Sequence, residues 1–277
     1  MIVDAHQHFW NPARGDYGWL TPDLPICRVC GPDELAPLMR AAGVDATVLV
    51  QAAPTVAETD YILEIARRTP WVLGVVGWLD LGAPDAVEQI RARARDPLFV
   101  GVRPMLQDIA EAEWILRPDL DAALAQVAAQ RLVFDALVLS HQVGVICELA
   151  GRHPGLSIVL DHGAKPRLGD ADAMAAWQAD IRRLAARPNV ACKISGLLTE
   201  LPRGVDVAHL KGAVTVLQEA FGPQRLLWGS DWPVLTLAGD YAGWHAMVRD
   251  MVAPDAQGAV MGGNALRLYG AKRAAQR

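Results

Sequence analysis

Four side chains in the sequence could act together on a carbonyl group, namely His6, His8, His162 and Asp231. His6 and His8 are two residues apart, and side chains with that spacing on a β-strand point the same way. Such a pair can bind one divalent metal ion or donate to one carbonyl oxygen. The residue types therefore indicate one shared polar site, with all four as candidate catalytic residues and candidate metal ligands.

Each of these residues has a simpler interpretation when it is taken alone. A His-x-His pair on a strand is often incidental, and Asp231 could instead cap a helix. Strand parity predicts that His162 points inward and Asp161 outward, and that Asp4 shares the histidine face of the first strand. The hypothesis of one shared site therefore depends on all four candidates lying at strand ends.

Eight short β-rich runs alternate along the chain with Ala/Leu/Arg/Glu-rich stretches of helical periodicity. The runs cover residues 2–8, 47–51, 72–78, 99–105, 133–138, 157–162, 190–195 and 226–231. Thr55 and Glu58 have capping-box spacing before one helix, and Pro32 follows Gly31 at the start of another. This alternation predicts βαβ units and a parallel sheet. A (β/α)8 barrel is favoured over an open doubly wound sheet, because no G-x-G-x-x-G motif follows an early strand.

Length and composition agree with one barrel domain over residues 1–277. The chain has 277 residues, of which 52% are apolar and 21% charged, so a disordered chain is excluded. One α/β barrel takes roughly 250 residues, which is nearly the whole length. The net charge of -5 does not suit a broad basic surface, so we expect no nucleic-acid partner. A small-molecule substrate is expected, and a homo-oligomer stays open.

The N-terminus enters strand-like sequence directly, without the basic and apolar regions of a signal peptide. The most apolar run, residues 71–79, is shorter than the ~20 residues of a membrane helix. We therefore expect a cytoplasmic protein with no membrane partner.

Four cysteines are too few for a disulfide scaffold, so we expect reduced thiols. Cys27 and Cys30 have the C-x-x-C spacing of a zinc or redox pair, but incidental thiols are favoured without a second pair.

In a barrel the active site lies at the carboxyl ends of the strands, so basic residues there are candidates for substrate binding. Arg103 could hold a carboxylate or sugar hydroxyls, or could form an internal ion pair with Asp135 or Asp108. Lys165 and Lys193 carry the same two interpretations.

Tryptophan is enriched, with nine residues against four Phe and four Tyr. Trp10, Trp78 and Trp232 lie at or just past strand ends, where an indole can stack on a sugar face or pack into the core. We include these three as candidate substrate-binding residues. His209 and His245 are expected at the surface, and His141 in a loop near a helix start.

Six segments resemble the amidohydrolase superfamily, and more closely its sugar-lactonase branch, which includes L-fuconolactonases and L-rhamnonolactonases. They are VDAHQHFW (3–10), GVRPMLQD (101–108), VLDHGAKP (159–166), KISGL (193–197), GSDWP (229–233) and GNA (263–265). The segments occur in the family's order and span almost the full chain.

The resemblance implies a (β/α)8 barrel that hydrolyses the cyclic ester of an aldonic acid in carbohydrate catabolism. It makes Asp231 the group that activates water, while the histidines or a bound divalent metal polarise the carbonyl. Binuclear members carry a lysine or glutamate and a histidine where this chain has Arg103 and Asp135, so we expect one zinc ion or none. The alternatives are a zinc-dependent decarboxylase of the same superfamily and a non-catalytic relative that binds a sugar acid.

Overall fold

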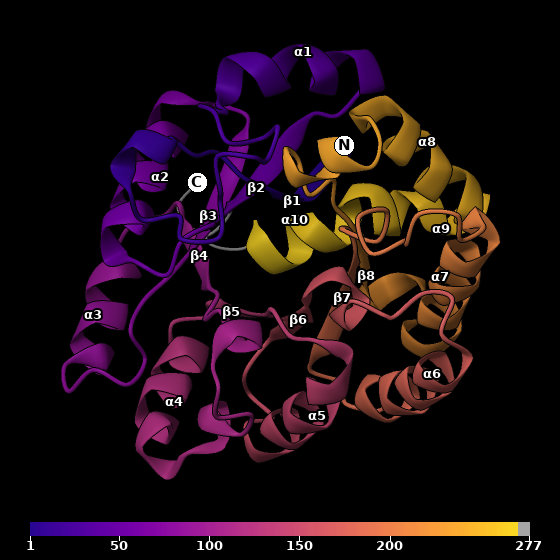
Figure 1. Ribbon diagram of the computed structural model, residues 1–277. Helices are drawn as coiled ribbons and strands as arrows, with labels where there is room; N and C mark the ends of the chain where they lie inside the picture. The colour runs from indigo at the N-terminus through magenta and orange to yellow at the C-terminus, as the bar shows by residue number, and fades with distance from the viewer. Residues whose placement is uncertain (271–277) are drawn as a thin grey trace.

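The computed structural model describes residues 1–270, which form one sheet of eight parallel strands in the order β1 to β8. The strands are β1 (Val3–Gln7), β2 (Ala46–Val50), β3 (Val72–Gly77), β4 (Phe99–Val102), β5 (Val133–Ala136), β6 (Ile158–Leu160), β7 (Val190–Ile194) and β8 (Leu226–Trp228). The segment after the last strand pairs with the first strand through a parallel bridge between Trp232 and Gln7. The protein is therefore a (β/α)8 barrel, as predicted (Figure 1).

Helices surround this barrel and also cover one of its ends (Figure 1). They are α1 (Pro32–Ala42), α2 (Val56–Arg68), α3 (Ala86–Arg93), α4 (Asp121–Ala129), α5 (Val143–Arg152), α6 (Ala171–Ala185), α7 (Val207–Phe221), α8 (Tyr241–Met251), α9 (Pro254–Gly258) and α10 (Asn264–Tyr269). Helix α10 lies in the middle of the ring in Figure 1, and its Ala265 and Tyr269 pack with Val3 and Val48 inside the barrel. It therefore closes the end at which the strands begin.

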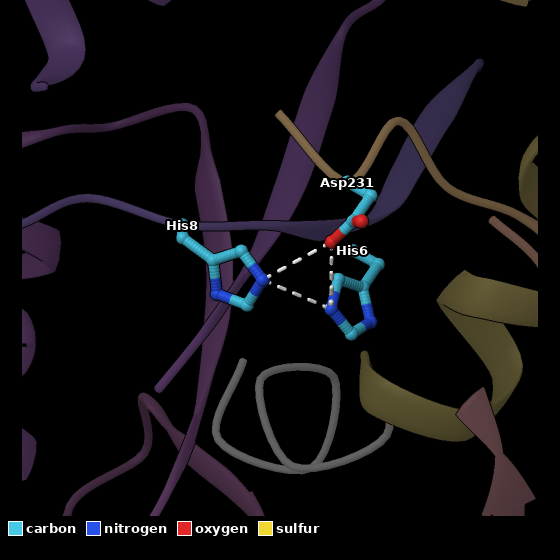
Figure 2. A group of neighbouring side chains, drawn as sticks. All are labelled: His6, His8 and Asp231. Carbon is cyan, nitrogen blue, oxygen red and sulfur yellow. Dashed lines mark hydrogen bonds and ion pairs between the residues drawn. The ribbon is translucent and has the colours of Figure 1, made fainter. Parts of the chain in front are cut away.

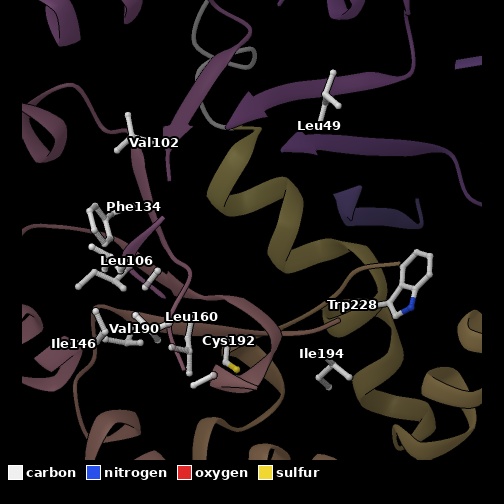
Figure 3. Close-up of a cluster of buried hydrophobic side chains, with 14 of the residues drawn as sticks. Leu49, Val102, Leu106, Phe134, Ile146, Leu160, Val190, Cys192, Ile194 and Trp228 are labelled. Carbon is white, nitrogen blue, oxygen red and sulfur yellow. The ribbon is translucent and has the colours of Figure 1, made fainter. Parts of the chain in front are cut away.

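Apolar side chains on both faces of the strands hold the barrel together. Val48 and Val50 of β2 belong to the cluster inside the barrel, whereas Leu49 belongs to the larger cluster between strands and helices. Figure 3 shows members of the outer cluster, including Leu49, Phe134 and Trp228. Burying one such aliphatic or aromatic side chain stabilises the fold by about 1.5–3 kcal/mol. The strands that carry the polar residues are thus firmly held.

The local helix signals agree with the structure at one helix and only partly at another. Helix α1 begins at Pro32 after Gly31, as predicted. At α2 the Thr55 side chain accepts a hydrogen bond from the Glu58 amide at 3.0 Å, which is the first half of a capping box. The Glu58 carboxylate does not return to Thr55, however. It accepts from the Ala52 amide at 3.0 Å instead.

Two predictions about the chain as a whole can also be checked within residues 1–270. All four cysteines there are free thiols, as expected from their number. No helix in this part of the chain combines the length and apolar character needed to cross a membrane.

Candidate active site

The imidazoles of His6 and His8 and the carboxylate of Asp231 meet at the carboxyl end of the barrel (Figure 2). The two histidine Nε2 atoms are 3.2 Å apart, and Asp231 Oδ1 lies 3.2 Å from His8 Nε2 and 3.5 Å from His6 Nε2. His162 stands beside them, with its Nε2 4.0 Å from Asp231 Oδ1. The structure thus brings together all four residues that the sequence suggested, from β1 and from the segments after β6 and β8.

The segment after β8 is joined to β1 by backbone hydrogen bonds, and this places Asp231. The Asp231 amide donates to the His6 carbonyl at 2.7 Å, and the His8 amide donates to the Trp232 carbonyl at 2.7 Å. Gly229 makes this close approach feasible, because a Cβ there would stand 2.7 Å from the His6 Cβ. Asp231 itself has φ of 60°, a left-handed conformation that Asp tolerates better than most residues.

Asp4 does not share the histidine face, so that prediction was wrong. The pairing of β1 with β2 shifts register between Asp4 and Gln7, which breaks the simple alternation of side chains. The Asp4 carboxylate accepts from the Ser230 amide at 2.8 Å and from the Tyr241 hydroxyl at 3.0 Å. Burial raises the pKa of Asp4 to about 6, although its hydrogen bonds with Ser230 oppose this. Asp4 therefore supports the segment that carries Asp231.

The predicted orientation of Asp161 was also wrong, whereas His162 does point into the site. Val159 faces the barrel interior, and regular alternation from that residue turns Asp161 inward as well. His162 follows the end of β6 with φ of 54°, so a left-handed turn rather than strand parity directs its ring to the site. A hydrogen bond of 2.9 Å between His162 Nδ1 and Ser195 Oγ holds the ring there.

A buried network of charges lies next to His6 inside the barrel. The Lys193 ammonium contacts Asp135, Asp161 Oδ1 at 3.0 Å and His6 Nδ1 at 3.2 Å. Arg103 Nη1 lies 3.3 Å from Asp161 Oδ2. The partner of Arg103 is therefore Asp161, and not Asp135 or Asp108 as the sequence suggested. Because each buried charge has an opposite charge in contact, the network avoids the cost of an isolated buried ion.

The environment sets the protonation state of the site at neutral pH. Burial lowers the pKa of His6 well below its usual value and that of His162 to about 4, although Asp161 and other carboxylates oppose this. Burial alone would raise the pKa of Asp231, but the nearby His162 ring and the adjacent His8 and His6 rings outweigh it and hold that pKa below its ordinary range. The site therefore combines an ionised carboxylate with neutral His6 and His162 rings.

The donor set fits a divalent metal ion such as zinc. His8 Nδ1 lies 2.8 Å from the Val50 carbonyl and donates its proton there, which leaves the Nε2 lone pair free. The three mutual distances among His6 Nε2, His8 Nε2 and Asp231 Oδ1 are 3.2, 3.2 and 3.5 Å. Zinc with bonds of about 2.0–2.1 Å in tetrahedral geometry separates its ligand atoms by about 3.3–3.4 Å.

The site opens into a cavity of about 210 Å³. Arg103 and Lys165, two predicted substrate-binding residues, line it together with His8, His162 and Asp231. The rest of its wall is formed by Trp19, Ala52, Met105, Gln107, Asp108, Leu137 and Val234. Met105, Gln107 and Asp108 belong to the family-like segment 101–108, and the other four lie in segments after strand ends, but the sequence did not indicate any of the seven as a substrate-binding residue.

The three predicted tryptophans lie away from this cavity wall. Trp10 is fully buried behind His8, with its ring 6.1 Å from the His8 ring and its indole N–H donated to the Ile26 carbonyl. Trp232 is 2% exposed and packs its ring edge-on against Phe9. Trp78 lines a neighbouring cavity of about 230 Å³. Trp10 and Trp232 are therefore core residues, whereas Trp78 is half-buried in the wall of the neighbouring cavity.

The other histidines lie outside the site. His209 and His141 are exposed, as expected, and His141 lies in a short helical turn after β5. His245 is 4% exposed and packs against Trp228 at 4.9 Å between ring centroids, so its predicted surface position was wrong. It lies on the face of α8 that packs against the barrel.

The fold and the set of polar groups at the carboxyl rim define a barrel hydrolase. The chain belongs to the amidohydrolase family, whose model matches residues 3–271.

Two curated relatives are similar over nearly their full lengths. The L-fucono-1,5-lactonase of Burkholderia ambifaria is 44% identical over 96% of this chain and 94% of that protein. The L-fucono-1,5-lactonase of Burkholderia multivorans is 37% identical over 97% and 96% of the two chains. An amidohydrolase from Burkholderia multivorans, solved with bound zinc, superposes with a TM-score of 0.92 at 36% identity over 98% and 99%.

Solved decarboxylases are much more distant. The 5-carboxyvanillate decarboxylase from Sphingomonas paucimobilis is 16% identical with a TM-score of 0.69, which shows a shared fold alone. The comparison therefore gives no support to the decarboxylase alternative.

Proposed function

We propose that the protein is a lactonase that opens L-fucono-1,5-lactone, or a closely related sugar-acid lactone, to the aldonic acid in carbohydrate catabolism. The observation that carries this proposal is the ionised Asp231 beside neutral imidazoles on the wall of a small cavity. The two similar L-fucono-1,5-lactonases support the choice of substrate.

The cavity suits a single sugar ring. Its volume of about 210 Å³ is below the ~300–1,000 Å³ of sites for drug-sized ligands. Arg103 and Lys165 supply cationic donors for carbonyl and hydroxyl oxygens, while Leu137 and Val234 supply apolar contacts. A lactone presents both kinds of surface.

Asp231 acts as the general base. It takes a proton from a water molecule as the water oxygen forms a bond to the lactone carbonyl carbon, and the carbonyl oxygen gains the negative charge. The neighbouring cationic and N–H donors on the wall, Arg103 and His162, stabilise that oxyanion. The ring C–O bond then breaks, and the ring oxygen takes the proton from Asp231, which returns the carboxylate to its ionised form.

A bound zinc ion would be held by His6, His8 and Asp231, next to His162, and would polarise the carbonyl and lower the pKa of water. The zinc-bound structure of the similar amidohydrolase supports this assignment. The family resemblance leaves a metal-independent reaction open as well.

The test is a pH-indicator assay of L-fucono-1,5-lactone and other aldonolactones, run on chelator-treated and on zinc-loaded protein. We expect acid release with at least one lactone, and release at least about a hundredfold slower with Asp231→Asn under the same conditions. Tight binding of lactones without hydrolysis in either metal state would contradict the proposal and favour the non-catalytic alternative.

We also place the protein in the cytoplasm and leave a homo-oligomer open. Cell fractionation and sedimentation measurements test these two points.

A further inference from the structure

Trp19 and Ala52 form one side of the cavity, and a hydrogen bond joins them. The Trp19 indole N–H donates to the Ala52 carbonyl at 2.7 Å. Trp19 is 38% exposed, so few apolar contacts hold it from the solvent side. Its ring packs edge-on against Trp10, which in turn lies against the His8 ring. The position of this indole therefore depends strongly on the Ala52 peptide.

The buried Glu58 side chain hydrogen-bonds to the amide of the same Ala52 residue. Its Oε1 accepts the Ala52 amide at 3.0 Å, and its side chain is fully buried at the start of α2. Capping-box spacing would send this carboxylate to the Thr55 amide, but that amide donates to the Ala53 carbonyl instead. The Glu58 carboxyl group therefore hydrogen-bonds to the backbone just after β2 and not to the N-terminus of its own helix.

The other oxygen of Glu58 lies in a buried polar cluster. Glu58 Oε2, Asp16 Oδ1 and Tyr17 Oη are all buried without a hydrogen-bond partner in the described part of the chain. Asp16 Oδ2 accepts from Arg14 at 2.9 Å and from Thr55 Oγ1 at 3.0 Å, which ties the segment before Trp19 to the same helix start. An unpaired buried carboxylate oxygen is costly, whereas a carboxylic acid supplies a donor for such a cluster.

We propose that Glu58 is a positioning residue for the lactone, because it holds the Ala52 peptide, and with it the Trp19 indole, in place on the cavity wall. This inference rests on the proposed lactonase function. Glu58 acts through Ala52 and Trp19 and touches neither substrate nor metal ligand.

The charge state of Glu58 makes the inference testable by pH. Burial raises the pKa of Glu58 to about 8, although Arg103 and the Ala52 amide oppose this. The titratable groups facing it are Asp16 and Tyr17 from the segment before α1, Tyr61 from α2 and Arg103 from the segment after β4, with Arg14 paired to Asp16. At neutral pH Glu58 is therefore mostly uncharged, and above pH 8 a carboxylate must be accommodated in this cluster.

The kinetic experiment compares Glu58→Ala with Glu58→Gln. Loss of the side chain should raise KM about tenfold or more with little change in kcat, because the reacting groups at Asp231 are untouched. Glutamine keeps an acceptor for the Ala52 amide and supplies N–H donors, so it should rescue KM. In the wild type KM should change between pH 7 and 9, because ionisation alters the hydrogen bonds of the Glu58 carboxyl group, and in Glu58→Gln it should stay flat. The matched control is Glu64→Gln on the exposed side of α2, whose carboxylate pairs with Arg68.

A second readout does not depend on catalysis. The indole N–H resonance of Trp19, assigned with Trp19→Phe, should titrate with a midpoint near pH 8 in the wild type and should not in Glu58→Gln. An unchanged KM in Glu58→Ala, or identical pH profiles of the wild type and Glu58→Gln, would overturn the inference. If the wild type opens no lactone, the proposed function fails, while the Trp19 resonance still decides the role of Glu58.

Discussion

Replacing Asp231 with asparagine tests the base role with little disturbance of the fold. Asparagine has nearly the same size, and it tolerates the left-handed φ of 60° at this position about as well as aspartate. The asparagine side-chain N–H can donate to His8 Nε2, which lies 3.2 Å from the carboxylate oxygen in the wild type. The variant therefore loses the negative charge and the capacity to accept a proton, and keeps the shape of the site.

The expected loss can be calculated from general base catalysis. Such a base contributes about 10²–10⁴ in rate, which corresponds to about 2.7–5.5 kcal/mol in the activation barrier. The His162 ring and the adjacent His8 and His6 rings hold the pKa of Asp231 below its ordinary range against the effect of burial. The carboxylate is thus fully ionised at pH 6–8, and wild-type kcat should be flat there.

The assay measures kcat from initial rates of acid release between pH 6 and 8, with metal content determined for each sample. Circular dichroism checks the fold, and Asp250→Asn on the exposed side of α8 is the control. A kcat for Asp231→Asn within threefold of the wild type would refute the base role. A tenfold change in wild-type kcat per pH unit in this range would show that kcat depends on the titration of a group other than Asp231.

Three further predictions address substrate binding, packing and pH. Lys165→Met should raise KM about tenfold and change kcat little, since a hydrogen bond from a charged donor contributes about 1.5–3 kcal/mol, whereas Lys211→Met on the exposed face of α7 should have no effect. Gly229→Ala should lower the free energy of unfolding by about 1–3 kcal/mol in urea titrations, because its Cβ would lie 2.7 Å from a side-chain carbon, while Gly212→Ala meets nothing within 4 Å and should not destabilise. For His162, the pKa of about 4 in the fold lies below the usual 6.5, so the unfolded chain binds more protons and stability falls as pH drops from 6.5 towards 4. In chelator-treated protein the free energy of unfolding should fall by about 2 kcal/mol between pH 7 and 5 because of this histidine. An equally steep fall in the free energy of unfolding of His162→Asn would contradict this prediction.

The strand pattern was predictable because local periodicity determines it. Each of the eight β-rich runs overlaps one observed strand, and every observed strand stops earlier than predicted, at 102 instead of 105 for β4. The apolar runs end where polar residues begin, and in a parallel barrel those carboxyl ends meet at one rim. That rule alone suffices to bring the histidines of β1 and the residues after β6 and β8 together.

The orientation of individual side chains at the rim was not predictable from alternation. Asp161 was expected outside the barrel but ion-pairs with Lys193 and Arg103 inside it. Asp4 was expected on the same face as His6 and His8, but it points away from them because β1 shifts its register after Asp4. Alternation holds only within a regular ladder, and the chain leaves the ladder where the active-site segments begin.

The sequence by itself determined the barrel, its eight strands and the four residues that gather at the rim, because these follow from the spacing of apolar and polar residues along the chain. Only the tertiary structure decided which groups neutralise Arg103 and Lys193, which tryptophan faces the cavity, and from which backbone amide the Glu58 carboxyl group accepts a hydrogen bond. These contacts join residues far apart in the chain, and burial selects among partners that local sequence treats as equivalent.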